Sequence, residues 1–192
     1  MVATRPICHV VAGPNGAGKS TFALRYLPQR AGEIDFVNPD LMAQGASPLD
    51  IRLSAFDAAR QTLNRIRGLM GRGESFGFET TLSGRSQLTL FSECRDAGFE
   101  IDLYYLWMPD AHPLPSRIRH RVLNGGHDVP EADVMRRFER SRTGLRAYAD
   151  LADRVLVFDV QPQIPELIWR RNGSEIAVDP ARAAAMKKGL GL

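Results

Sequence analysis

The chain alternates short runs of mostly apolar residues with longer segments in which apolar positions recur every three or four residues. The first pattern is typical of buried strands, and the second is typical of helices that cover a sheet. Strands are predicted over residues 7–12, 34–37, 75–78, 99–108 and 154–160. Helices are predicted over residues 18–27, 49–70, 87–97, 115–123 and 130–149.

Proline and glycine residues help to place the ends of these predicted elements. Pro28 is predicted to stop the first helix, because proline lacks the backbone N–H that a helix interior needs. Near the end of the chain, Asn172-Gly173 separates two short apolar runs, 167–170 and 175–178. This dipeptide is favoured in tight hairpins, so a hairpin is predicted there. A last short helix is predicted over residues 180–188.

Strands that are separated by helices indicate a parallel sheet with helices on both faces. The predicted fold class is therefore α/β, with three layers and a mostly parallel central sheet. A chain of 192 residues fits one domain, and we find no repeat, low-complexity tract or linker. We predict a single domain over residues 1–192, with the hairpin and helix at about 163–192 as an appendage.

Composition narrows the class of protein. Apolar residues make up 44% of the chain and charged residues 24%, as in soluble globular proteins. No apolar stretch is long enough for a membrane span, and the N-terminus lacks a secretory signal. We therefore expect a cytoplasmic protein without membrane contact. Cys8 and Cys94 are isolated and lack zinc-ligand spacing, so we expect reduced packing residues.

The net charge of +3 and the isoelectric point near 9.1 raise the question of nucleic-acid binding. Lysines occur only at Lys19, Lys187 and Lys188, and many arginines gather between residues 117 and 146 among acidic residues. Either this cluster forms a local anion site, or arginine simply occupies solvated surface. Neither interpretation favours a broad nucleic-acid-binding face.

The strongest motif is Gly13-Pro14-Asn15-Gly16-Ala17-Gly18-Lys19-Ser20. It matches G-x-x-x-x-G-K-[ST] and stands between a predicted strand and a predicted helix, as a P-loop requires. Glycines let the backbone approach phosphate oxygens, and the helix N-terminus presents N–H groups to the anion. Lys19 is predicted to reach the β- and γ-phosphates, Ser20 to ligate Mg²⁺, and Thr21 to lie near the α-phosphate. ATP and Mg²⁺ are therefore the expected ligands.

Asp40 follows the second predicted strand. In sheets of this kind, ligands bind outside the carboxyl ends of the strands, so Asp40 is expected to face the phosphates. A carboxylate there can take the proton from an attacking hydroxyl. Alternatively, Asp40 only caps a turn or helix after Pro39.

Glu79, Thr80 and Thr81 end the third predicted strand. A carboxylate beside two hydroxyls can bind the hydroxyl groups of an acceptor molecule. Glu79 can alternatively hold Mg²⁺ through water, as the acidic residue of a Walker B strand does. Ordinary capping of a loop is the third reading.

Basic residues flank a glycine pair farther along the chain. Arg117 and Arg121 share one face of a predicted helix, Gly125-Gly126 supplies a hinge, and Arg137 lies on the next helix. The pattern indicates a helical lid whose arginines stabilise the transferring phosphate. His127 either contacts substrate or phosphate, or is a polar turn residue.

Four strings occur in order: GPNGAGKSTF, FVNPD, FETTLSGRS and GGHDVPEADVMRRFERS. Together they resemble the zeta-toxin-like kinases, especially the short stand-alone members described as ABC-type ATPases or kinases. The resemblance covers about residues 5–180. It implies a P-loop kinase fold, and its best-understood members phosphorylate a hydroxyl of a UDP-activated amino sugar.

The resemblance also implies roles for individual residues. Lys19 corresponds to the Walker lysine and Asp40 to the general base, while Glu79 and Thr81 fall in the substrate-binding strand end. One of Arg117 and Arg121, with His127 or Arg137, matches the phosphate-contacting basic pair. The chain departs from the family pattern at Phe138, where tyrosine is frequent, and at Phe158-Asp159-Val160.

We therefore predict an ATP-dependent kinase that phosphorylates a hydroxyl of a small molecule, with a UDP-sugar as one candidate acceptor. A toxin role with a protein antitoxin is a further hypothesis. An ATPase or nucleotide-gated binding module is the alternative, although no ABC signature segment is present. A kinase or binder of RNA is a weaker alternative, which strong salt-dependent RNA affinity would favour.

Overall fold

The computed structural model describes residues 5–39, 51–123 and 129–190. Within these ranges it contains seven strands and six helices. The strands are β1 (Ile7–Ala12), β2 (Asp35–Val37), β3 (Phe76–Thr80), β4 (Glu100–Trp107), β5 (Arg154–Asp159), β6 (Glu166–Asn172) and β7 (Ser174–Ala177). The helices are α1 (Lys19–Ala31), α3 (Ile51–Arg72), α4 (Arg85–Asp96), α5 (Pro113–Leu123), α6 (Glu131–Leu151) and α7 (Pro180–Leu190).

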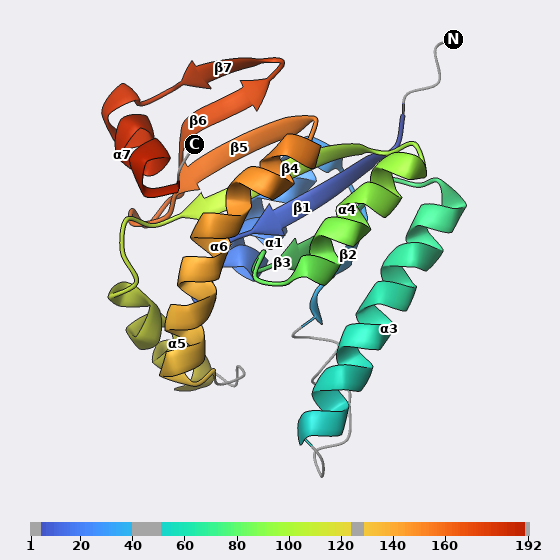
Figure 1. Cartoon of the computed structure of the whole chain (residues 1–192), viewed down its shortest axis with the longest axis horizontal. Coiled ribbons are helices and arrows are strands. Elements are labelled where there is room, and N and C mark those ends of the chain that lie inside the picture. The colour runs from blue at the N-terminus through green and yellow to red at the C-terminus, as the bar shows by residue number, and fades with distance from the viewer. Residues whose placement is uncertain (1–4, 40–50, 124–128, 191–192) are drawn as a thin grey trace.

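The described strands form one sheet in the order β2-β3-β1-β4-β5-β6-β7 (Figure 1). The first five are parallel to their neighbours, and β6 and β7 are antiparallel. β1 lies between β3 and β4, so the loop that follows β1 stands at the middle of the sheet edge. Ala12 pairs with Thr80, which brings the carboxyl ends of β1 and β3 together.

Helices cover both faces of the sheet, which confirms the predicted three-layer α/β fold (Figure 1). On one face, α3, α4, α6 and α7 contribute buried apolar side chains, among them Ile66, Phe91, Leu145 and Met186. On the other face, α1 and α5 contribute a second set, among them Phe22, Leu27, Leu114 and Ile118. The strands between these layers are buried on both faces, which explains their continuous apolar runs.

The first helix runs past Pro28 and ends at Ala31, so the prediction that Pro28 stops it was wrong. Proline removes the backbone hydrogen bond to the carbonyl of Leu24, four residues earlier. Leu24 is 79% exposed, so water can satisfy that carbonyl. Gly32, at a φ of 68°, ends the helix and donates its N–H to the Pro28 carbonyl at 3.1 Å.

The C-terminal hairpin continues the central sheet. β6 pairs with β5 along its length, and β7 pairs with β6 around Gly173, whose φ is 71°. This is the turn that Asn172-Gly173 predicted. Helix α7 packs on β6 through Met186 and on α6, so residues after β5 extend the layers already present.

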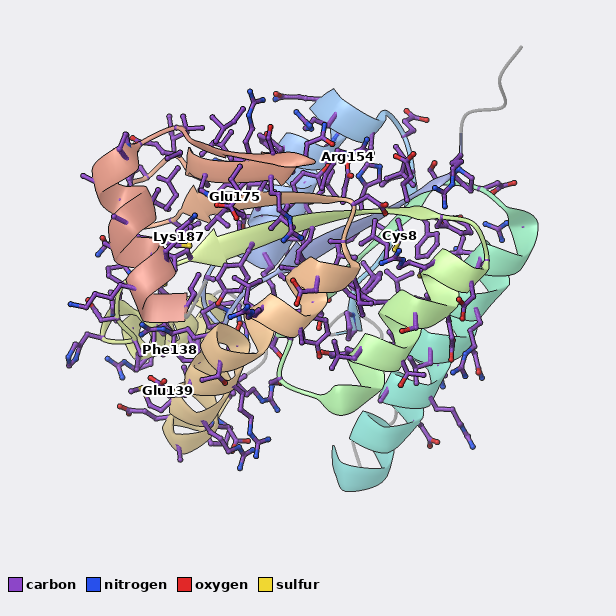
Figure 2. All side chains as sticks on the ribbon, turned by 45° about the horizontal axis from the view of Figure 1, so that its top comes forward. Cys8, Phe138, Glu139, Arg154, Glu175 and Lys187 are labelled. Atoms are coloured by element: carbon purple, nitrogen blue, oxygen red, sulfur yellow. The ribbon has the colours of Figure 1, made fainter. Side chains whose placement is uncertain are left out.

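Cys8 and Cys94 are free, buried thiols whose Sγ atoms lie 3.8 Å apart, which confirms them as packing residues. Cys8 lies on β1 inside the core (Figure 2). Burial, with the neighbouring Cys94, raises the pKa of the Cys8 thiol, which keeps it protonated at neutral pH. No helix in the described ranges is both long and apolar enough to cross a membrane.

Candidate nucleotide-binding site

The loop Gly13–Ser20 joins the end of β1 to the start of α1. Gly13 has a φ of 148°, and a Cβ there would lie 2.8 Å from the Leu106 carbonyl oxygen of β4. Gly18 has a φ of 88° immediately before α1. A side chain would therefore clash at the first position and strain the backbone at the second, so both motif glycines are required by the local geometry.

Helix α1 begins at Lys19 without a side-chain cap. The N–H groups of its first turn are therefore available to an anion, and the helix dipole favours one there. The Lys19 ammonium donates to the Pro14 carbonyl at 3.1 Å, across the same loop. Backbone N–H groups and the Lys19 charge thus converge on one concave surface, as phosphate binding requires.

Ser20 joins three elements. Its hydroxyl donates to a carboxylate oxygen of Glu79 at 2.9 Å and accepts the side-chain N–H of Asn38 at 3.1 Å. Glu79 lies on β3, directly opposite Val11 of β1, and is only 5% exposed. The strand order therefore places the predicted Walker-type carboxylate against the predicted Mg²⁺ ligand.

The two threonines after Glu79 have different environments. The Thr80 carbonyl accepts the Gly13 N–H at 3.2 Å, and its buried hydroxyl accepts the Leu82 N–H at 3.1 Å. Thr80 therefore holds the P-loop and the turn after β3. The Thr81 hydroxyl, which is half-buried, lies 2.7 Å from the hydroxyl of Ser83.

A cavity of about 380 Å³ opens over the P-loop. Its lining includes the predicted phosphate ligands Lys19 and Ser20 together with Glu79, and the α5 residues Arg117, His120 and Arg121. The structure therefore brings both predicted α5 arginines to the phosphate side. Among the described residues that line this cavity, cationic side chains outnumber the single carboxylate, so the cavity suits a polyanion with a metal ion.

A second cavity, of about 570 Å³, lies beside the first, between α1 and the segment 160–165 that follows β5. Phe22 and Tyr26 of α1 line one side, and their rings stack with centroids 4.6 Å apart. Pro162 and Pro165 contribute apolar surface from the segment opposite. Flat apolar walls with a few polar groups are typical of a pocket for a planar ring.

Arg117 lines both cavities. Its guanidinium donates to the Val160 carbonyl at 3.0 Å, so α5 is fixed to the segment that closes the second cavity. A planar guanidinium can contact phosphate oxygens and also stack on an aromatic ring. Arg117 thus lies between the phosphate-side cavity and the second cavity, whose flat walls suit a planar ring.

Other predicted residues stand apart from these cavities. Arg137 lies on α6, and it does not line either cavity in the part of the chain that the structure describes. Asp40 and His127 lie outside the described residues, as does the Gly125-Gly126 hinge. Among the described residues, no group of three His, Cys, Asp or Glu side chains gathers to hold a metal ion.

Three parts of the site were not predicted from the sequence. Asn38 was assigned no role from the sequence, yet its amide donates to the Ser20 hydroxyl. His120 joins the phosphate-side cavity, and the segment 160–165 forms a pocket wall. The sequence contained a signal for the segment 160–165, because this segment follows the carboxyl end of a parallel strand, where ligands bind in such sheets.

The chain is similar to known proteins over the part that carries this site. A family model described as an AAA domain matches residues 9–143, which include the P-loop, Glu79 and the α5 arginines. An uncharacterised protein of Haemophilus influenzae is 32% identical over 126 residues, which are 66% of this chain and 88% of that protein.

Two solved structures share the fold. A chain of the PezAT toxin–antitoxin system of Streptococcus pneumoniae superposes with a TM-score of 0.67 and 15% identity, covering 100% of this chain and 80% of that one. A chain of the AvrRxo1-ORF1:-ORF2 complex with ATP gives 0.75 and 15%, covering 96% of this chain and 64% of that one. The chain therefore spans less than two thirds of the AvrRxo1 chain.

At this level of identity the structural likeness establishes the fold. It confirms the fold that the resemblance of the four sequence strings implied. The family model covers well over half of the chain and includes every described residue of the phosphate-side cavity. The protein belongs to the AAA-domain family of P-loop proteins.

Proposed function

We propose that this protein is a kinase that transfers the γ-phosphate of ATP to a hydroxyl of a small molecule. The proposal rests on one observation. The phosphate-side cavity brings together Lys19, Ser20, Glu79 and the α5 arginines, and it lies beside a second cavity that suits a planar ring. A motor or switch protein also needs a P-loop, but arginines that gather over the phosphate side favour transfer of a phosphoryl group.

ATP fits the two adjoining cavities as one ligand. The triphosphate occupies the P-loop cavity, where Lys19 and backbone N–H groups neutralise the β- and γ-phosphates. The adenine occupies the pocket between Tyr26 and the segment 160–165, with Arg117 at the junction. The AvrRxo1 complex, which shares this fold, was crystallised with ATP.

Magnesium fits the oxygen donors on the phosphate side. The Ser20 hydroxyl and the Glu79 carboxylate are hydrogen-bonded to one another, and both are hard oxygen ligands of the kind that Mg²⁺ prefers. Ser20 would hold the ion directly and Glu79 through water. When bound, the ion neutralises charge on the phosphate oxygens.

The acceptor hydroxyl needs a base. We assign this role to Asp40, which would accept the hydroxyl proton as the oxygen attacks the γ-phosphorus and ADP leaves. Asn38, two residues earlier in the chain, donates to Ser20, and this contact supports a place for the end of β2 at the phosphate edge. Arg117 and Arg121 stabilise the charge on the transferring phosphoryl group.

The test is incubation with γ-labelled ATP and Mg²⁺ against a panel of nucleotide sugars, nucleosides, cofactors and RNA. A labelled product identifies the acceptor, and nucleotide sugars head the panel because of the zeta-toxin resemblance. Lys19→Ala and Asp40→Asn should each lower transfer by at least about a hundredfold. Asp40→Asn should still bind ATP, whereas Lys19→Ala should bind it weakly.

Lys188→Ala is the matched control, because Lys188 is an exposed lysine of α7 far along the chain from the P-loop. Its transfer rate should equal that of the unmodified protein. Release of free phosphate with every acceptor would replace the kinase by the ATPase alternative. Full transfer by Asp40→Asn would remove the assignment of the base.

A protein partner belongs to the same proposal. PezAT is a toxin–antitoxin system, and AvrRxo1-ORF1 was crystallised together with ORF2. We therefore propose that a small protein encoded beside this one binds it as an antitoxin and blocks phosphate transfer. Co-expression of the two reading frames should yield a stable complex that no longer transfers phosphate, and full transfer by the complex would contradict this.

A further inference from the structure

The end of the β5–β6 pair carries two opposed carboxylates. Asp159, the last residue of β5, pairs with Glu166, the first residue of β6. Like charges directly opposite one another destabilise an antiparallel pair. The Asp159 side chain is also only 5% exposed, so its negative charge needs a partner inside the protein.

Arg182 of helix α7 supplies that partner. Its guanidinium donates to Asp159 at 3.2 Å, to Glu166 at 2.5 Å and to Asp179 at 2.7 Å. These hydrogen bonds raise the pKa of Arg182, so the guanidinium stays charged. One side chain therefore ties both strand ends to the last helix.

The six residues between these strand ends, 160–165, form the wall of the second cavity. The second carboxylate oxygen of Asp159 accepts the Gln161 N–H at 2.9 Å, which fixes the first turn of this segment. The Val160 N–H donates to the Trp107 carbonyl, and the Val160 carbonyl accepts from Arg117. The segment is thus held by Arg182 at both ends and contacts Arg117 near its start.

Removal of Arg182 would leave Asp159 as a buried, uncompensated anion that faces Glu166. Breaking one partner of such a pair is costly, because the remaining charge must find water or move. An outward movement of the segment 160–165, which follows Asp159 directly and lines an open cavity, would bring this carboxylate to water. Helix α7 itself would remain, because Ala183, Met186 and Leu190 are buried in the core.

We propose that Arg182 is a positioning residue for the base pocket of the nucleotide, through its hold on both ends of the segment 160–165. The proposal rests on ATP as the ligand of the two cavities. It assigns a role in nucleotide binding to the last helix of the chain, which has no side chain in either cavity among the residues described.

The experiment compares the affinity of ATP with that of inorganic tripolyphosphate, measured by calorimetry at fixed Mg²⁺. Tripolyphosphate contacts only the P-loop side, so it reports on that side alone. Arg182→Gln should weaken ATP by about tenfold, which corresponds to roughly 1.4 kcal/mol, and should leave tripolyphosphate unchanged. The KM for ATP should rise in step, with kcat preserved.

Lys187→Gln is the matched control. Lys187 lies on the same helix and forms an ion pair with Glu175 (Figure 2). Its ammonium lies over the ring of Trp169, and it lines neither cavity among the residues described. The Lys187→Gln variant should bind ATP and tripolyphosphate as the unmodified protein does. Asp159→Asn added to Arg182→Gln should regain part of the lost ATP affinity, because the amide still accepts the Gln161 N–H and no buried anion remains, whereas the tie to Glu166 stays broken.

The possible outcomes separate clearly. Unchanged ATP affinity in Arg182→Gln overturns the proposal, and so does an equal loss of both ligands, which indicates general unfolding. Failure of the double variant to regain ATP affinity also counts against it. If the unmodified protein binds tripolyphosphate but not ATP, or binds neither, the proposed function fails before the role of Arg182 is reached.

Discussion

At the scale of single residues, a buried polar network joins His9 of β1 to residues of β4 and β5. His9 contacts the Tyr104 hydroxyl at 3.1 Å, and that hydroxyl donates to Asp102 at 3.2 Å. Arg154 forms an ion pair with Asp102 at the start of β5. Burial lowers the pKa of His9; Arg154 and Arg30 lower it further, and Asp102 opposes them. His9 is therefore neutral in the folded protein at neutral pH.

This network predicts a pH dependence of stability. The unfolded chain takes up a proton at His9 near pH 6.5, whereas the folded chain resists protonation to lower pH. The free energy of unfolding should therefore decrease as the pH falls below about 6.5. His9→Gln should reduce this decrease, measured as the urea midpoint between pH 8 and pH 5.

His112→Gln is the control for that experiment, because His112 is exposed at the start of α5. Its pH dependence should match that of the unmodified protein. If His9→Gln loses stability as steeply as the unmodified protein when the pH falls, other titratable groups cause the decrease in the free energy of unfolding.

Single residues also mark the limit of sequence reasoning. The roles of Gly18 and Lys19 follow from a local motif, since Gly18 supplies a φ of 88° before the helix and Lys19 donates to Pro14 in the same loop. The partner of Ser20 does not, because Glu79 is 59 positions away and reaches Ser20 only through the pairing of β1 and β3.

At the scale of elements, helix α6 holds the turn that follows Glu79. The Tyr148 hydroxyl donates to the Gly84 carbonyl at 2.6 Å, and its ring packs on Phe91 with centroids 5.2 Å apart. Leu82, in the middle of this turn, has a φ of 52°, which is strained for a residue with a side chain. The contact with α6 thus helps to keep the turn in an unfavourable conformation.

Tyr148→Phe tests this contact. The variant keeps the ring but removes the hydroxyl, so the Gly84 carbonyl loses this donor and keeps only the N–H of Gln87, which lies at 3.2 Å. The free energy of unfolding should fall by about 1 kcal/mol, measured by urea denaturation. Tyr26→Phe on α1 is the control and should change stability by less, and a similar loss in both variants would contradict a specific role for the Gly84 contact.

The boundaries of β1, β3, β4 and β5 followed well from the apolar pattern, because these strands are buried along nearly their whole length and read as mostly apolar runs. Helix α1 was the exception. Its extension past Pro28 depends on Leu24 facing water, and an apolar residue at that position gives no sign in the sequence that it is exposed.

At the scale of the whole molecule, ligand binding should be visible as stability. ATP with Mg²⁺ at one hundred times its Kd should add about 2.7 kcal/mol to the free energy of unfolding. For a chain of this size, that corresponds to a rise in Tm of roughly 5–10 °C. The measurement is a thermal melt with and without ATP.

Lys19→Ala should lose most of this rise, while Lys188→Ala should keep it. An equal rise in the Lys19 variant would mean that ATP binds elsewhere. The result is independent of the acceptor, so it tests the nucleotide site before any substrate is known.

The sequence by itself determined the P-loop, the alternation of strands and helices, and the three-layer fold. These follow from local spacing and from apolar periodicity, which adjacent residues encode. Tertiary structure alone decided which strand lies beside which, and therefore that Glu79 contacts Ser20 and that Arg117 lines two cavities. The wall at 160–165 and its link to Arg182 were likewise decided by contacts between distant segments, because strand pairing and helix docking bring together residues that no local pattern relates.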